Sequence, residues 1–196
     1  MATRLSSLLV ATLLSALVIA MPAEAATAKR AATCADTEKV PAGGNLAEVE
    51  RATFCLLNAE RDERGLRPLK RNQRLARAAD RHVDDMVKHR YFAHDSRDGS
   101  RFSDRIKDTG YLSGPGSWVV GENLAWGSGT SGSAAAIVKA WMASPGHRAN
   151  ILNGRFRDIG IGLTLGSPRG GDGATYATEF GAVTRSARAS RGARSR

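Results

Sequence analysis

The stretch from Trp141 to Leu152 constrains the fold most, because it predicts an amphipathic helix that the sequence itself must stop. Pro145 cannot continue a helix, since its ring clashes with the preceding turn and it lacks an N–H group, and Gly146 lets the backbone bend. His147 follows this break, which predicts an imidazole presented into a cleft. A structural histidine bonded to loop carbonyls is the alternative. The apolar residues that set the helical spacing before the break are Ile137, Val138, Trp141 and Met142.

The N-terminal residues predict export. A short basic start precedes an apolar run over residues 5–20, and Ala23 and Ala25 are small residues of the kind that a signal peptidase reads. We therefore expect residues 1–25 to be a signal peptide and the protein to be secreted, extracellular or associated with the cell wall. No later apolar stretch approaches the ~18 residues of a membrane span, so no transmembrane segment is expected. The roughly 170 residues that remain suffice for one domain.

The charge balance favours anionic surroundings. The chain carries a formal net charge of +10, from 29 Lys and Arg against 19 Asp and Glu. Residues 185–196 hold five arginines, no acid and no core-forming residue, so we expect a disordered basic tail. An anionic wall polymer or lipid headgroups would suit such a charge. Because neither a nucleic-acid motif nor interleaved aromatic residues accompany it, we expect no specific nucleic-acid partner.

Cys34 and Cys55 are the only cysteines of the chain. In an exported protein they reach an oxidising environment, so we expect them to form a disulfide bond. This bond would tie an irregular N-terminal arm, residues 26–44, to the first helix. The bond would close a loop of about twenty residues, which would stabilise the fold by about 3 kcal/mol in the chain-entropy estimate. Two buried free thiols are the alternative.

Two long helices are expected next. Asn45 and Glu48 have the spacing of a capping box at the start of the first, and its charged final turns, residues 60–64, are expected to be solvated. Asn72 is expected to cap the second helix. His82 lies on the apolar face of that helix, so we expect a hydrogen-bonded core residue rather than a ligand. The apolar face consists of Leu75, Ala79, His82, Val83 and Met86.

The second half of the chain predicts strands around one further helix. A short helix over residues 102–107 and a strand over 118–120 come first, and Ser133 begins the helix that carries Trp141. Alternating apolar residues then predict a strand from Ile159 to Leu165 with one buried face, followed by a return strand over 174–183. Helices on both sides of a small antiparallel sheet would bury its faces, which makes this an α+β fold.

Five motifs occur in order along the chain. They are Tyr91-Phe92-Ala93-His94, Gly121-Glu122-Asn123-Leu124-Ala125, Trp141 with residues 144–152, Ile159-Gly160-Ile161-Gly162 and Thr178-Glu179-Phe180-Gly181. In this order and spacing the chain resembles the CAP superfamily of cysteine-rich secretory, allergen and pathogenesis-related proteins, and most of all its bacterial SCP-like extracellular branch. The resemblance covers residues 45–184 and implies a three-layer α–β–α sandwich with a central cleft.

Two histidines and two acids line the cleft in that family. Ser144 stands where the second acid would be, as in a bacterial branch that lacks this acid. Glu179 stands where relatives often carry Gln, and the sequence leaves open whether it faces the cleft. The cleft or ligand-binding residues that the resemblance implies are therefore His94, Glu122, His147, Ser144 and Asn123.

Three functions remain open for this cleft. Two imidazoles and a carboxylate suit a divalent metal such as Zn²⁺, with His94 and His147 as ligands, and a water-filled hydrogen-bonded cluster is the alternative. A serine hydrolase is not expected, because no orienting acid accompanies Ser144 and His147. We expect a monomeric secreted domain that binds a small ligand, a lipid or a wall component. A Zn²⁺-dependent extracellular hydrolase and a purely structural interaction domain are the alternatives.

Overall fold

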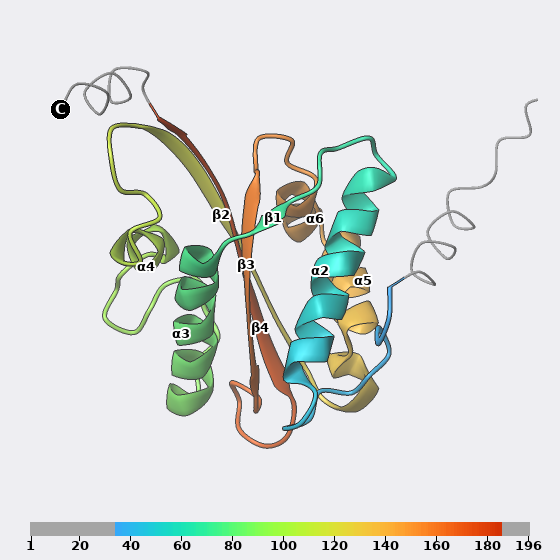
Figure 1. Cartoon of the computed structure of the whole chain (residues 1–196). Coiled ribbons are helices and arrows are strands. Elements are labelled where there is room, and N and C mark those ends of the chain that lie inside the picture. The colour runs from blue at the N-terminus through green and yellow to red at the C-terminus, as the bar shows by residue number, and fades with distance from the viewer. Residues whose placement is uncertain (1–33, 186–196) are drawn as a thin grey trace, which may run out of the picture.

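Three layers make up the protein, seen here in a computed structural model that describes residues 34–185 (Figure 1). A four-stranded sheet lies in the middle, with α3 and α4 on one face and α2, α5 and α6 on the other (Figure 1). The expected α–β–α sandwich is thus confirmed. The predicted signal peptide and residues 186–196 of the predicted tail lie outside the described residues. The elements are α2 (Leu46–Asp62), β1 (Lys70–Arg71), α3 (Gln73–His89), α4 (Phe102–Asp108), β2 (Gly116–Gly127), a 3-10 turn (Gly129–Gly132), α5 (Ala134–Ala143), α6 (Pro145–Ile151), β3 (Asp158–Leu165) and β4 (Ala174–Arg185).

The sheet is mixed rather than purely antiparallel. Its strand order is β1-β3-β4-β2, and the three long strands pair antiparallel, as expected. The two-residue strand β1 adds a parallel pair with β3, which the sequence did not predict because Lys70 and Arg71 carry no apolar pattern. The strand expected over 118–120 lies near the start of the twelve-residue β2. β4 extends to Arg185, so the first residue of the predicted tail belongs to the sheet.

The main core lies between the sheet and the helices α2, α5 and α6. Trp141 of α5 is 1% exposed, and its indole N–H donates to the carbonyl oxygen of Leu124 on β2 at 3.0 Å. The Trp141 ring meets Tyr176 of β4 edge to face, with centroids 6.4 Å apart. Phe156 and Phe180 stack with centroids 5.5 Å apart. Large aromatic side chains therefore fix α5 and the segment after α6 against the sheet.

On the opposite face α3 packs closely against glycines of β3. A Cβ atom at Gly160 would lie 2.0 Å from the backbone nitrogen of Ala76, and one at Gly162 would lie 2.4 Å from the carbonyl carbon of Ala79. No larger residue fits at either position unless the helix moves away. β3 therefore has both faces covered, whereas the sequence predicted one buried face.

The start of α2 differs from the expected capping box. The Asn45 side chain makes no bond to the helix and turns back to the arm instead. Its Oδ1 accepts a hydrogen bond from the backbone N–H of Ala42 at 2.8 Å, and its Nδ2 donates to the carbonyl of Val40 at 3.0 Å. Glu48 pairs with Lys39 of the arm. Both predicted capping side chains thus hold the arm in place.

The end of α2 also differs, because Arg61 of the predicted solvated stretch is fully buried. Its guanidinium donates to the carbonyl oxygens of Arg67 at 3.0 Å, Ile151 at 2.7 Å and Asn153 at 3.0 Å. A charged group bonded to three carbonyl oxygens can remain buried, and here it joins α2 to the C-terminal end of α6. In contrast, Asn72 caps α3 as predicted, accepting bonds from the N–H groups of Arg74 and Leu75.

Cys34 and Cys55 form the predicted disulfide bond, with their Cα atoms 5.8 Å apart. The bond links the arm to the middle of α2, and the alternative of two free thiols is wrong. None of the helices within residues 34–185 is long and apolar enough to span a membrane.

Candidate functional site

Glu122 is the centre of the candidate site. It lies on β2, on the face toward α3, and its side chain is only 1% exposed. Its Oε1 accepts a hydrogen bond from Nδ1 of His94 at 2.7 Å, and its Oε2 accepts one from Nη2 of Arg105 at 2.6 Å. Burial raises the pKa of Glu122, but hydrogen bonding with His94 and Glu179 and the charge of Arg105 together hold it below its usual value. Glu122 is therefore an ionised carboxylate with both oxygens engaged.

Glu179 lies directly opposite Glu122 in the β2–β4 register and shares its face of the sheet. The sequence left open whether Glu179 faces the cleft. Glu179 faces the Glu122 cluster beside Arg105, and it is completely buried there. Among the described residues no N–H or O–H group reaches either of its oxygens, and Nη2 of Arg105 lies 3.8 Å from Oε1. Burial and the charge of Glu122 raise the pKa of Glu179 well above its usual value. The raised pKa favours the protonated, uncharged form of Glu179 beside the carboxylate of Glu122.

His82 is the hydrogen-bonded core residue that the sequence predicted. Its Nε2 lies 2.9 Å from the carbonyl oxygen of Ala93, so this nitrogen carries the proton. Burial, followed by the charge of Arg105, lowers the pKa of His82 and keeps the ring neutral. Its Nε2 is also 4.0 Å from Oε2 of Glu122, which places His82 beside the cluster.

The exposed His94 and the half-buried His147 differ in the direction of their pKa shifts. The His94 side chain is 55% exposed, and its hydrogen bond to Glu122 raises the pKa of His94 above the usual value for histidine. Partial burial lowers the pKa of His147, and the charge of His94 lowers it further. The two shifts thus favour the charged form of His94 and the neutral form of His147.

Pro145 begins a new helix, contrary to the expected open bend. It occupies the first turn of α6, where its missing N–H would have no helical partner in any case. His147 therefore stands in the first turn of α6 and not in a loop. Ser144 links the two helices, and within the described residues no hydrogen bond joins its hydroxyl to His147. The arrangement lacks the contact that a serine nucleophile and its base require.

Asn123 holds α6 against β2. It is completely buried, and its Nδ2 donates to the carbonyl oxygen of His147 at 3.1 Å. The amide of Asn150 donates to Oδ1 of Asn123 at 2.9 Å and to the carbonyl of Glu122 at 3.0 Å. Asn123, expected to line the cleft, is thus a positioning residue, and Asn150 is a second one that sequence reasoning missed.

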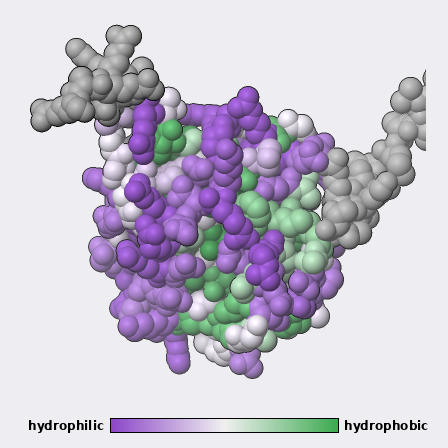
Figure 2. Space-filling model, viewed as in Figure 1, coloured by the Kyte–Doolittle hydropathy of each residue, from purple (hydrophilic) through white to green (hydrophobic). Residues whose placement is uncertain are grey.

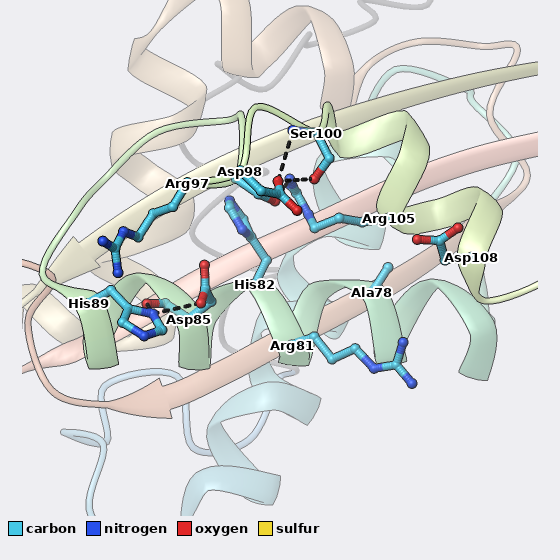
Figure 3. A pocket seen from close by; sticks show the side chains of 11 residues that line it. Ala78, Arg81, His82, Asp85, His89, Arg97, Asp98, Ser100, Arg105 and Asp108 are labelled. Atoms are coloured by element: carbon cyan, nitrogen blue, oxygen red, sulfur yellow. Dashed lines mark hydrogen bonds and ion pairs between the residues drawn. The ribbon is translucent and has the colours of Figure 1, made fainter.

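A polar groove of about 420 Å³ reaches the cluster from the side of α3. His82 and Arg105 line it between α3 and the loop that carries Asp98 and Ser100 (Figure 3). Two bonds from Ser100 fix the carboxylate of Asp98 at the rim. The groove carries both signs of charge, with Asp85, Asp98 and Asp108 facing Arg81, Arg97 and Arg105. Such a lining suits a polar ligand rather than an apolar one.

The residues present do not fit a zinc site, one of the two possibilities that the sequence left open. Both oxygens of Glu122 are occupied by hydrogen bonds, one of them from a permanently charged guanidinium that would repel a cation. His94 uses Nδ1 for the same carboxylate. Within residues 34–185 no group of three or more His, Cys, Asp or Glu side chains is arranged to hold a metal ion. Arg105 thus supplies the positive charge that Glu122 needs.

Arg105 is the principal residue that sequence reasoning missed. It lies in α4, and its Nη1 also donates to the carbonyl of His94 at 2.9 Å and to the hydroxyl of Ser96 at 3.1 Å. It therefore fixes the backbone of His94 as well as the carboxylate. The chain has many arginines, and no spacing or local motif distinguishes this one.

A three-layer sandwich with a histidine and a glutamate meeting beside its central sheet defines a domain of the CAP type. The chain belongs to the CAP family, described as the cysteine-rich secretory protein family, whose model matches residues 54–180.

Relatives agree with this assignment. The chain is 37% identical over 155 residues to the uncharacterized protein YkwD of Bacillus subtilis (strain 168), covering 73% of this chain and 57% of that protein. An extracellular protein containing an SCP domain from Bacillus anthracis has a similar structure, with a TM-score of 0.56 and 27% identity, over 76% of this chain and 45% of that one. An outer surface protein of Borrelia burgdorferi, at 19% identity and a TM-score of 0.55, covers 67% of this chain and 90% of its own and shows the shared fold alone. The chain spans about half the length of the two Bacillus proteins.

Replacing Glu179 with Gln should stabilise the protein at high pH. Because the pKa of Glu179 is raised in the folded state, the folded protein retains a proton that the unfolded chain loses above about pH 4.5, and wild-type stability falls as pH rises. The fall amounts to at most ~1.4 kcal/mol per pH unit. Glu179→Gln removes this pH-dependent loss. The free energy of unfolding of the variant, relative to the wild type, should therefore grow from about pH 4 to about pH 8 in urea titrations. A constant difference across this range would show that Glu179 is not held protonated.

Proposed function

We propose that this chain is an exported CAP domain that binds a polar ligand beside His94 and His147, and that it does so as a monomer. The observation that carries the proposal is the engagement of Glu122 by both His94 and Arg105. A carboxylate held in this way is neither a free general base nor an open metal ligand, so its role is to orient and charge His94.

The state of His94 suggests the chemistry of the ligand. Its Nδ1–H is donated to Glu122, which leaves the exposed Nε2–H of a charged imidazolium as a donor toward solvent. A carboxylate, phosphate or carbonyl oxygen would accept this bond. Small anionic ligands, lipid headgroups and wall fragments all offer such oxygens, which supports the binding functions expected from the sequence.

Two observations support export. The residues before Ala26 have the pattern of a signal peptide. The Bacillus anthracis relative is described as extracellular and the Borrelia protein as an outer surface protein. We propose the same location, free or associated with the cell wall, for this chain.

A hydrolase using the same residues is the alternative function. It would need an activated water and a group to stabilise an oxyanion. Two observations disfavour a hydrolase. Both oxygens of Glu122 are occupied by hydrogen bonds, and no hydrogen bond joins the hydroxyl of Ser144 to His147 within the described residues. Zinc addition tests this directly: we expect saturating Zn²⁺ to leave the melting temperature unchanged. A Zn²⁺-dependent rise that disappears in both His94→Ala and His147→Ala would favour the hydrolase.

Binding can be tested with defined probes. We expect soluble muropeptides or phosphatidylglycerol vesicles to shift the side-chain NMR signals of His94 and His147, and His94→Ala to abolish binding of whichever probe is active. Arg51→Ala is the control, because Arg51 is also an exposed cationic residue but lies on α2, across the sheet from the groove. Equal losses in the two variants, or no response to either probe class, would contradict the proposal.

A further inference from the structure

A second, strongly basic cavity lies at the N-terminal end of α3. It measures about 500 Å³ and is distinct from the Glu122 cluster, which meets α3 at His82. Its arginines come from three elements of the fold, namely β1, α3 and β4. Among its lining residues are Arg71, Arg74, Arg77, Arg185, Asp158 and Tyr111. Hydrophilic side chains predominate on the surface over α3 and α4, whereas apolar ones gather toward α2 and α5 (Figure 2).

The charges in this cavity are poorly balanced. Arg71 pairs with Glu50, but Arg74 donates only to the neutral carbonyl of Gly110, at 2.9 Å. Arg77 and Arg185 have no ion pair with any residue between 34 and 185. Asp158 is the one acid in the lining, and it accepts a hydrogen bond from the hydroxyl of Tyr111 at 2.8 Å. Four guanidinium groups therefore surround a hollow with one carboxylate.

Phosphate is the anion that suits this geometry. Guanidinium groups present paired N–H donors that match two oxygens of a phosphate, and the positive end of the α3 dipole adds to the same field. The cavity also exceeds a single phosphate in size. Four guanidinium groups from three elements can therefore contact more than one phosphate of a ligand with repeated phosphates.

The aromatic content of the cavity argues against nucleic acid. Proteins that bind single strands stack bases on exposed aromatic rings. Tyr111, the only aromatic residue of the lining, is 6% exposed and its hydroxyl is held by Asp158. A phosphate polymer without bases needs no aromatic ring for stacking, so the lining of this cavity suits it.

We propose that this cavity binds successive phosphate groups of a polyol-phosphate polymer. The site is independent of His94 and Glu122. Binding requires Arg77 and Arg185, whose charges are otherwise unused, and weakens as salt rises because exposed charges are screened.

Calorimetric titration of the full-length protein with poly(glycerol phosphate) tests the proposal. We expect Arg77→Ala and Arg185→Ala each to weaken binding about tenfold, as loss of one charge-assisted contact would. Arg51→Ala is the matched control, since Arg51 is an exposed arginine of α2 outside the cavity. His94→Ala should leave this binding unchanged, which separates the cavity from the proposed ligand site. A chain with serine at positions 188, 191, 194 and 196 should retain the dependence on Arg77.

Three outcomes would overturn the proposal. Equal weakening by Arg51→Ala and Arg77→Ala would mean that diffuse surface charge binds the polymer. Unchanged affinity in the Arg77→Ala/Arg185→Ala protein would place binding elsewhere. A single-stranded oligonucleotide of matched charge that binds more tightly than poly(glycerol phosphate) would assign the cavity to nucleic acid.

Discussion

Gly160→Ala should destabilise the protein by about 3 kcal/mol or more. The new methyl carbon would lie 2.0 Å from the nitrogen of Ala76 and 2.1 Å from the carbonyl carbon of Leu75, both in the backbone of α3. Overpacked cores usually lose roughly 1–3 kcal/mol, because side chains and backbone can shift slightly. Here the obstacle is a helix backbone, which can yield only if α3 moves off the sheet. Urea denaturation monitored by circular dichroism measures the loss.

Gly146→Ala is the matched control for this experiment. Gly146 lies in α6 with no atom within 4 Å of the added carbon, and alanine favours a helix by up to ~1 kcal/mol over glycine. This variant should be as stable as the wild type or slightly more stable. If Gly160→Ala loses less than about 1 kcal/mol, α3 does not pack as closely on β3 as described.

Arg105→Met should cost about 3–5 kcal/mol at neutral pH, because it removes the guanidinium that is hydrogen-bonded to the buried carboxylate of Glu122. The stability lost in Arg105→Met should depend on pH in a defined direction. In the wild type the lowered pKa of Glu122 contributes stability above its usual value of 4.5, and this contribution is lost as pH falls through the folded pKa. Without Arg105 the pKa of Glu122 should rise above its value in the wild type, so the defect of the variant should shrink as pH falls.

Two further variants control the Arg105 experiment. Arg97→Met removes an exposed arginine from the rim of the same groove and should change stability by less than about 0.5 kcal/mol. Arg105→Met combined with Glu122→Gln should recover much of the loss, because a neutral amide needs no cation. Failure of the double variant to recover would mean that Arg105 acts mainly through its bonds to the backbone of His94 and to Ser96 rather than through Glu122.

Local patterns predicted the elements whose causes are local. The apolar face of α3 and its cap at Asn72 follow from residues within a few positions of one another, and the structure confirms both. The strands β3 and β4 likewise follow from alternating apolar residues. The glycines of Ile159-Gly160-Ile161-Gly162 helped to identify the family. They are needed because α3 approaches β3 closely, and the residues of α3 lie far earlier in the chain.

The site was harder to predict because its partners are distant in sequence. The resemblance identified His94 and Glu122, which meet across 28 positions. Arg105 and Asn150 had no local signal, since each acts on a residue of another element. Pro145 misled the prediction for a different reason: proline both ends one helix and favours the first turn of the next, and only the packing of α6 on β2 decides between these roles.

The short helix α6 depends on the rest of the domain at both ends. Seven residues are too few for an independent helix in water. Asn123 holds its first turn from β2, while Arg61 of α2 binds the carbonyl of Ile151 where the helix ends. His147 is therefore carried on a preorganised segment. A ligand that contacts it need not order a loop first, so little conformational entropy is lost at that contact when the complex forms.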